Sequence, residues 1–432
     1  RAARPEPVIE NDIAWRIDAL VAFVFGKPIT IRSAAEDPNL RARIDRCLES
    51  AIEASGGMNL LQDAALLAAI HGHVDLLLRA DPLIDAGRSL ANPASLSDAA
   101  AADLARLARI DIVEAPRAIP LLSESDYRVL DAYCIRATRA SRTTTTTSTS
   151  PTPRSPLTRW ITPLAAARSR AQVARHTHTV LEVLSARHRH LYIDDTLVEE
   201  SPNTLGVLPV IHIQNASAPF RYAGISEVEP LIPLQDELNA RLSDRAHRVT
   251  LQSFNMYLAK GLDALADAPA LRVAPGQVWT TDNTDADVKA FGGDGHSPSE
   301  ERHIDEVREA MDKISAVSPV VLGVVRAKLG HLSSVNALRI TMLGVLAKTE
   351  RRRLAWTRAL SSLCSLLLRA LDLAGIVRTS EHERTIRIEW PDPLPASEED
   401  RLNTARLKRD IGIPAERILA ELGYAPRPEH LD

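Results

Sequence analysis

One uninterrupted helical pattern, over residues 334–375, limits the folds open to this chain more than any other feature. It contains no proline and ends at Gly375, and glycine suits the position that follows a helix end. A helix of this length would extend about 60 Å at ~1.5 Å per residue. Because ordinary globular helices are much shorter, the pattern predicts an elongated and oriented architecture.

Two shorter helices are predicted before it. In the first, Ser226 and Glu229 have capping-box spacing and apolar residues follow at helical intervals. These residues are Leu231, Leu234, Leu238, Leu242, Val249, Phe254 and Leu258. The second helix, from about residue 299 to 315, has two faces. Its apolar seam, predicted to pack on the first helix, consists of Ile304, Val307, Met311 and Ile314, and its solvated acidic face of Glu301, Asp305, Glu309 and Asp312.

The connections between these three helices differ in character. Residues 263–298 contain several glycines and predict a compact insert with short strands, such as residues 277–281. Residues 319–333 carry Arg326, Lys328 and His331 and no acidic side chain. Glycines at 323 and 330 permit hinge motion there. This loop is therefore a candidate for phosphate contacts, although a surface loop with incidental cations remains an alternative.

Size and composition restrict the class of protein. The chain has 432 residues, more than one hydrophobic core usually organises, and 45% hydrophobic with 25% charged residues is typical of globular domains. The net charge of −4 excludes global basicity, so any contact with nucleic acid must come from a local patch. Cys47, Cys134 and Cys364 are predicted to be buried free thiols in a reducing compartment. We find no signal peptide and no apolar run long enough to cross a membrane.

The first half of the chain mixes predicted helices with strands, so the fold class is α+β and mostly helical. Residues 139–157 interrupt this pattern with five successive threonines, followed by serines, prolines and arginines. Because few apolar groups are present to offset the cost of ordering, we expect a mobile loop. The pairs His71 with His73, His176 with His178, and His188 with His190 suggest zinc at first sight, but no Cys or carboxylate has matching spacing.

Motifs for catalysis are missing from the sequence. Gly26-Lys27 resembles part of a phosphate-binding loop, but Val21 replaces the first glycine and Pro28 replaces the Ser or Thr. No Gly-x-Ser-x-Gly run occurs, and no cysteine lies in a nucleophile motif. We therefore predict no catalytic residue, no cofactor and no metal.

Four stretches together resemble the tailed-bacteriophage portal proteins of the siphophage type. Near the start these are Phe25, Gly26, Lys27 and Pro28, and before the first long helix Glu200, Asn203, Gly206, Leu208, Pro209, Val210, Asn215, Gly224 and Ser226, continuing through Leu231, Ile232, Leu234, Asp236, Leu238 and Asn239. Further on they are Ser333, Ser334, Asn336, Ala337 and Leu338, where Val335 replaces the family's usual glycine, and then residues 386–390, Asp392, Leu394, Pro395, Gly412 and Ile413.

The resemblance implies a ring-forming subunit with wing, stem, clip and crown regions. Residues 1–228 would be the wing, 229–262 the first stem helix, 263–298 the clip and 299–318 the second stem helix. The tunnel loop would be residues 319–333, the long wing helix 334–376, and the C-terminal strand and crown 377–432. Arg326, Lys328 and His331 would then face DNA, and Glu301, Asp305, Glu309 and Asp312 would line the channel.

The same resemblance implies the partners. They are further copies of the chain in a dodecameric ring, double-stranded DNA in the channel, a terminase motor, a head-completion adaptor and the major capsid protein, with no membrane. The protein would be in the virion at the capsid vertex, and in the host cytoplasm during assembly. Two alternatives from other classes are a nucleic-acid-processing enzyme with an unrecognised site and a helical scaffolding protein.

Overall fold

A computed structural model describes residues 7–126, 129–143, 174–252, 256–260, 284–285, 287–291, 297–317, 319–322, 339–394 and 398–422. The chain divides into two compact units, one of residues Arg1–Leu20 with Glu227–Val345 and one of Val21–Ser226 with Leu346–Asp432. Both units contain helices and antiparallel strands, as the α+β class predicts. Among the described residues, no helix combines the length and the apolar character needed to cross a membrane.

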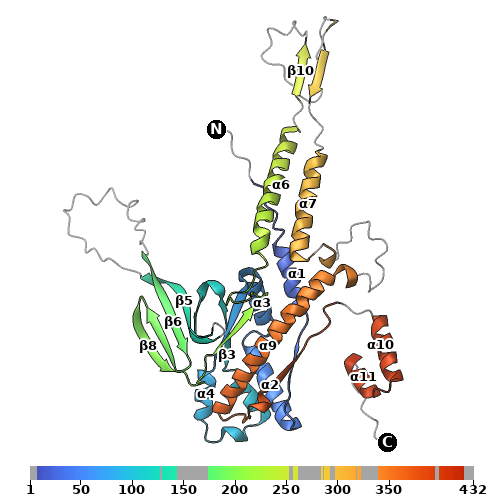
Figure 1. Cartoon of the computed structure of the whole chain (residues 1–432). Coiled ribbons are helices and arrows are strands. Elements are labelled where there is room, and N and C mark those ends of the chain that lie inside the picture. The colour runs from blue at the N-terminus through green and yellow to red at the C-terminus, as the bar shows by residue number, and fades with distance from the viewer. Residues whose placement is uncertain are drawn as a thin grey trace, which may run out of the picture. The chain divides into compact units, whose positions relative to one another are not determined.

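The first unit is built around two helices that run side by side, α6 (Ile232–Gln252) and α7 (Pro298–Ser315) (Figure 1). A 3₁₀ turn, η4 (Glu229–Leu231), precedes α6. Leucines of η4 and α6 meet the apolar seam of α7 in one buried cluster, which confirms the predicted packing. The cluster consists of Leu231, Leu238, Leu242, Ile304, Val307 and Met311, with Ile13 and Leu234 against it.

Ile314 does not belong to this seam, so that part of the prediction is wrong. Its side chain is 44% exposed. The reason is the end of α7 at Ser315, after which the chain turns at Ala316 with a φ of 58°. The turn carries Val317 into the interior instead, where it is fully buried.

The helix predicted over residues 229–262 is also shorter than expected. It ends at Gln252, and residues 256–260 form a strand, β10 (Met256–Lys260), that pairs antiparallel with β11 (Asp287–Phe291). The two strands satisfy each other's backbone groups, and this pairing overrides the helical spacing of Leu258. Residues 261–283, which include most of the predicted clip and its strand at 277–281, lie outside the described residues.

The second unit has a core of helices packed around a three-stranded sheet in the order β3–β2–β9. The strands are β2 (His73–Arg79), β3 (Arg109–Glu114) and β9 (Val210–Gln214). The helices that contribute to this core are α1 (Ala14–Phe25), α2 (Pro38–Ala54), α3 (Gly57–His71), α4 (Asp81–Arg88), α5 (Asp98–Ala105) and α9 (Leu343–Leu373). Cys47, Cys134 and Cys364 are buried free thiols, as predicted.

The long helix is shorter at its start than predicted. α9 has 31 residues, about 46 Å at ~1.5 Å per residue, and a turn at Met342 separates it from the helical residues 339–341. Gly344 disfavours a continuous helix here, and a Cβ on it would lie 3.1 Å from the Cβ of Ala316. The predicted end is confirmed: Gly375 has a φ of 71°, and the amide of Ile376 donates to the carbonyl of Leu371, which closes a Schellman motif.

A five-stranded antiparallel sheet completes the main part of this unit. Its strands, in spatial order, are β4 (Ala118–Leu122), β5 (Leu130–Thr143), β6 (Ala174–Ser185), β7 (His188–Ile193) and β8 (Thr196–Pro202). The predicted mobile loop at 139–157 is wrong at its beginning, because residues 139–143 pair with residues 174–178 in the ladder. Residues 144–157 lie outside the described residues.

The remaining described elements are a strand pair, two helices near the C-terminus and several 3₁₀ turns. β1 (Thr30–Ser33) pairs with β12 (Ile386–Glu389), and two helices come last, α10 (Glu398–Asp410) and α11 (Ala415–Leu422). Single 3₁₀ turns are η1 (Pro93–Ser95), η2 (Ala115–Arg117), η6 (Pro319–Leu322) and η7 (His382–Arg384).

Candidate functional site

The N-terminal residues 8–12, which we call the strap, lie along α6. Three side chains of α6, each one helical turn from the next, accept hydrogen bonds from backbone amides of the strap. The bonds run from Val8 to Ser243 Oγ (2.9 Å), from Glu10 to Asn239 Oδ1 (3.0 Å) and from Asp12 to Gln235 Oε1 (2.9 Å). The regular spacing fixes the strap in one register on the helix.

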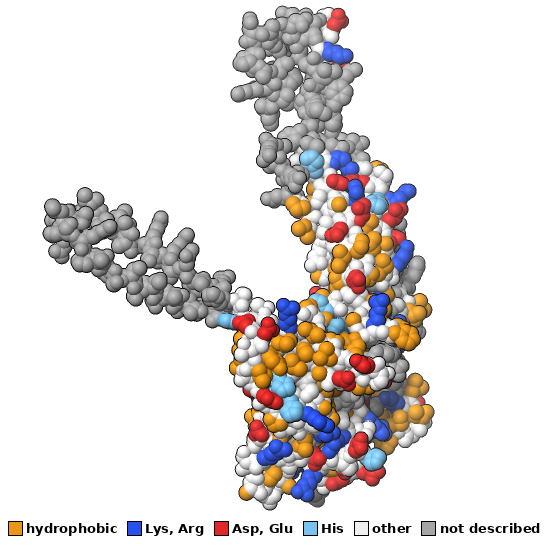
Figure 2. All heavy atoms as spheres, turned by 60° about the vertical axis from the view of Figure 1, so that its left-hand side comes forward, with side chains coloured by type: hydrophobic (Ala, Val, Ile, Leu, Met, Phe, Trp, Pro, Cys, Tyr) orange, Lys and Arg blue, Asp and Glu red, His pale blue; other side chains and the backbone are white. Residues whose placement is uncertain are grey.

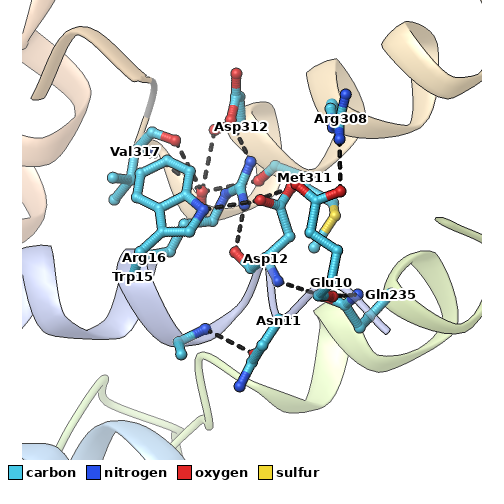
Figure 3. A network of polar contacts seen from close by, with 12 residues as sticks. Glu10, Asn11, Asp12, Trp15, Arg16, Gln235, Arg308, Met311, Asp312 and Val317 are labelled. Atoms are coloured by element: carbon cyan, nitrogen blue, oxygen red, sulfur yellow. Dashed lines mark hydrogen bonds and ion pairs between the residues drawn. The ribbon is translucent and has the colours of Figure 1, made fainter. Parts of the chain in front are cut away.

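The strap and α1 are also bound to α7 by two ion pairs (Figure 3). Arg16, whose side chain is 1% exposed, binds Asp312 at 2.5 Å and Asp12 at 3.0 Å. Arg308 of α7 binds Glu10 at 2.7 Å, but both side chains of this pair are partly solvated. The strap therefore joins the two long helices, with one buried charge at the centre of the contact.

Arg16 is held on several sides. The Trp15 ring lies 4.2 Å from its guanidinium carbon, and Trp15 Nε1 donates to Asp12 Oδ1 at 2.8 Å. Its Nε is buried without a hydrogen-bond partner among the described residues. A charge buried this deeply requires its carboxylates, since removing one of them leaves an uncompensated ion. Arg16 thus couples the position of α7 to that of the strap.

Three of the four predicted acidic side chains, Glu301, Asp305 and Glu309, are exposed on α7. Asp312 differs, because its side chain is only 24% exposed and pairs with Arg16. Along α6 and α7, acidic side chains are interspersed with Arg and Lys on the face that Figure 2 shows. The acidic face is therefore a narrow stripe of three carboxylates.

Charged pairs also link α6 to α7 away from the apolar seam. His303 lies 3.0 Å from Glu237, which binds Arg241 at 2.8 Å, and Arg248 contacts Glu300. The hydrogen bond from His303, followed by that from Arg241, lowers the pKa of Glu237. His303, Glu237 and Arg241 are solvent-exposed, so their contacts contribute little to stability but favour one pairing of the helices. The Arg248–Glu300 pair is partly buried.

The predicted DNA-facing residues Arg326, Lys328 and His331 lie outside the described residues. Lys27, by contrast, has a clear structural role. Its Nζ donates to the carbonyl oxygens of Asp392 (2.5 Å) and Leu394 (3.0 Å), so it fastens the segment at residues 392–394. Within the described part of the chain, no cluster of three or more His, Cys, Asp or Glu could hold a metal ion.

Known proteins provide the decisive observation. Residues 176–423 match the family described as "Phage portal protein, SPP1 Gp6-like", which is more than half of the chain. The chain belongs to this family. It is thus a portal protein of the capsid vertex, as the sequence motifs predict, and the family is a structural one.

A solved structure agrees with the fold of this portal protein. One, described as "Neck of empty GTA particle computed with C6 symmetry", aligns with a TM-score of 0.50 and 13% identity over 98% of this chain and 96% of that chain. Another, "Virion of native gene transfer agent (GTA) particle", has a TM-score of 0.48 and 12% identity over 99% and 97%. No curated protein sequence matches.

Proposed function

We propose that this portal protein assembles into a dodecameric ring whose central channel conducts double-stranded DNA during packaging, retention and ejection. The observation that carries the proposal is the family match, which includes α6, β10, β11, α7 and α9. The α6–α7 pair also supports it. The apolar seam packs the two helices against each other and the strap binds along α6, which makes a stiff helix pair suited to a channel wall. The role is structural and requires no cofactor.

In the proposed ring the acidic stripe lines the channel. Glu301, Asp305 and Glu309 succeed one another at four-residue intervals, about 6 Å along the helix axis at ~1.5 Å per residue. Duplex DNA presents one negative charge per ~1.7 Å of axis, so carboxylates repel it wherever it approaches. A repulsive wall keeps the moving duplex from adhering.

The tunnel loop has the opposite charge. Residues 319–333, described only at 319–322, contain Arg326, Lys328 and His331 with no carboxylate. Multiplied by the symmetry of a ring, these side chains form a basic collar that contacts phosphates without sequence preference. Counterion release makes such contacts steeply salt-dependent.

Other regions supply the docking surfaces. The clip, residues 263–298, includes β11 and follows β10 directly, and we assign to it the terminase motor and the head-completion adaptor. The wing is assigned to the major capsid protein. The protein is then part of the virion, and is present in the host cytoplasm during assembly.

A packaging assay on Arg326→Ala with Lys328→Ala tests the collar. We expect intact rings with shorter packaged DNA and poorer retention, most clearly at low salt. The matched control, Arg351→Ala with Arg378→Ala, removes the same charge from exposed positions elsewhere and should package normally. Normal packaging by intact rings of the first variant refutes the collar, whereas failure of the parent protein to form rings refutes the proposed function.

A further inference from the structure

A buried polar cluster in the second unit lies around Asp75, which is completely inaccessible to solvent. Its carboxylate accepts hydrogen bonds from Tyr133 Oη at 2.6 Å and Tyr222 Oη at 2.9 Å, and it faces His212 Nδ1 at 2.6 Å. Burial, and then the charge of Asp75, raise the pKa of both tyrosines. Both hydroxyls therefore remain donors, and Asp75 is a carboxylate with three donors around it.

His212 lies between two acceptors. Its Nδ1 faces Asp75, and its Nε2 faces the backbone carbonyl of Tyr222 at 2.7 Å. Both ring nitrogens are thus engaged, which fixes the His212 ring between Asp75 of β2 and the backbone of Tyr222.

His73 has the opposite environment. It is 8% exposed, its ring centroid lies 5.3 Å from that of His212, and its Nδ1 has no partner among the described residues. Burial lowers the pKa of His73, with His212 and His71 acting in the same direction and Asp75 against them. A proton on His73 would thus create a buried cation whose Nδ1 has no acceptor among the described residues.

The cluster holds down residues 215–226, the segment that leads in sequence into α6. Besides Tyr222, this segment is bound by the Asn215 amide, which donates to the Gly72 carbonyl at 2.9 Å, and by Ser226 Oγ, which donates to the Ile70 carbonyl at 2.5 Å. Within the segment, Asn215 Nδ2 donates to the Ile225 carbonyl at 3.0 Å. Gly72 and Gly224 pack so closely that a Cβ on Gly224 would lie 2.3 Å from the Gly72 oxygen.

We propose that His73, Asp75, Tyr133, His212 and Tyr222 form a proton-sensitive latch that holds residues 215–226 closed only while the buried His73 is neutral. Among the described residues, the other titratable groups that face the cluster are His71 from α3 and Arg117 from η2. Neither forms a hydrogen bond within the latch, so the balance depends on His73.

The sign of the pH dependence follows from His73. When the latch opens, His73 regains an ordinary pKa near 6.5. Below that pH the open state binds an extra proton on His73, so opening is favoured as the pH falls. The population of the open state should be about tenfold higher at pH 5.5 than at pH 7.5.

Hydrogen exchange measured on the full-length, assembled protein tests the latch. After correction for the chemical rate, exchange of residues 215–226 should be about tenfold faster at pH 5.5 than at pH 7.5. His73→Phe, which fills the buried site without a titrating group, should abolish this difference. The matched control His71→Gln should keep it.

A second measurement reads the state of His73 directly. In the parent protein, ¹⁵N chemical shifts of the histidine rings at pH 6.5 should show a neutral ring whose signal disappears in His73→Phe. Exchange that does not depend on pH between 5.5 and 7.5, or a protonated His73 at pH 6.5, would overturn the proposal.

Discussion

Arg16 provides the most direct test of the strap. We expect Arg16→Met, which keeps the length of the side chain and removes its charge, to free residues 8–12 from α7. The guanidinium is buried and serves both Asp12 and Asp312, so the substitution leaves two carboxylates without their cation. Arg308→Met is the matched control, because it breaks the second ion pair between the same strap and the same helix.

The burial of the two pairs sets the magnitudes. Removing one partner of a buried ion pair costs about 3–5 kcal/mol. Because Asp312 is 24% exposed, we expect Arg16→Met to cost about 3 kcal/mol, the lower end of this range. Arg308 and Glu10 are 30% and 43% exposed, so their pair contributes about 0–1 kcal/mol. These free energies raise the equilibrium constant for local opening of the strap about 150-fold in Arg16→Met and less than about fivefold in Arg308→Met.

Native-state hydrogen exchange of residues 7–20 measures this opening without requiring two-state unfolding of the whole chain. The expected result is a large loss of protection in Arg16→Met and a small one in Arg308→Met, with Asp312→Asn between them. Equal, small effects of the two arginine substitutions would show that the buried pair does not hold the strap, and the reasoning would fail.

Three further outcomes are expected. Ile304→Asp places a charge in the buried seam and should prevent ring assembly, whereas Ile314→Asp at the exposed position should assemble normally, as microscopy of both variants will show. Burial would raise the pKa of Glu182, but hydrogen bonds from Arg79 and Arg189 lower it to about 2. The ionised Glu182 therefore contributes about 3 kcal/mol to the free energy of unfolding above pH 4.5, and this contribution is lost as the pH falls toward 2. Denaturation measured at several pH values should show that Glu182→Gln removes this part of the acid dependence. Lys27→Met should free two carbonyls and increase protease cleavage after Leu394, while the folded core keeps its melting temperature.

Patterns of local periodicity predicted much of this fold. The seam and acidic face of α7 were evident because a helix exposes its two faces at fixed intervals, and the end of α9 was evident because Gly375 suits a left-handed cap. Pairings between residues far apart in the chain could not be predicted from the sequence. The β10–β11 ladder joins residues 256–260 to 287–291, and such a pairing leaves no local signal.

The candidate sites show the same division. The exposed carboxylates of α7 could be located from spacing alone. Arg16 was missed, although an arginine beside Ile13 and Ile17 in an apolar helix was a usable signal, because its partner Asp312 lies 296 residues away. The Asp75 cluster was missed for the same reason, since His212 is 137 residues from Asp75, and the pairing of His73 with His71 in sequence concealed its contact with His212.

The central claim is that 47.2 kDa subunits of this chain close into a ring around a DNA-sized channel. Electron microscopy of the purified protein, with class averages viewed down the symmetry axis, tests it most directly. We predict closed, dodecameric rings with an open centre. Monomers or open-ended filaments under the same conditions would contradict it.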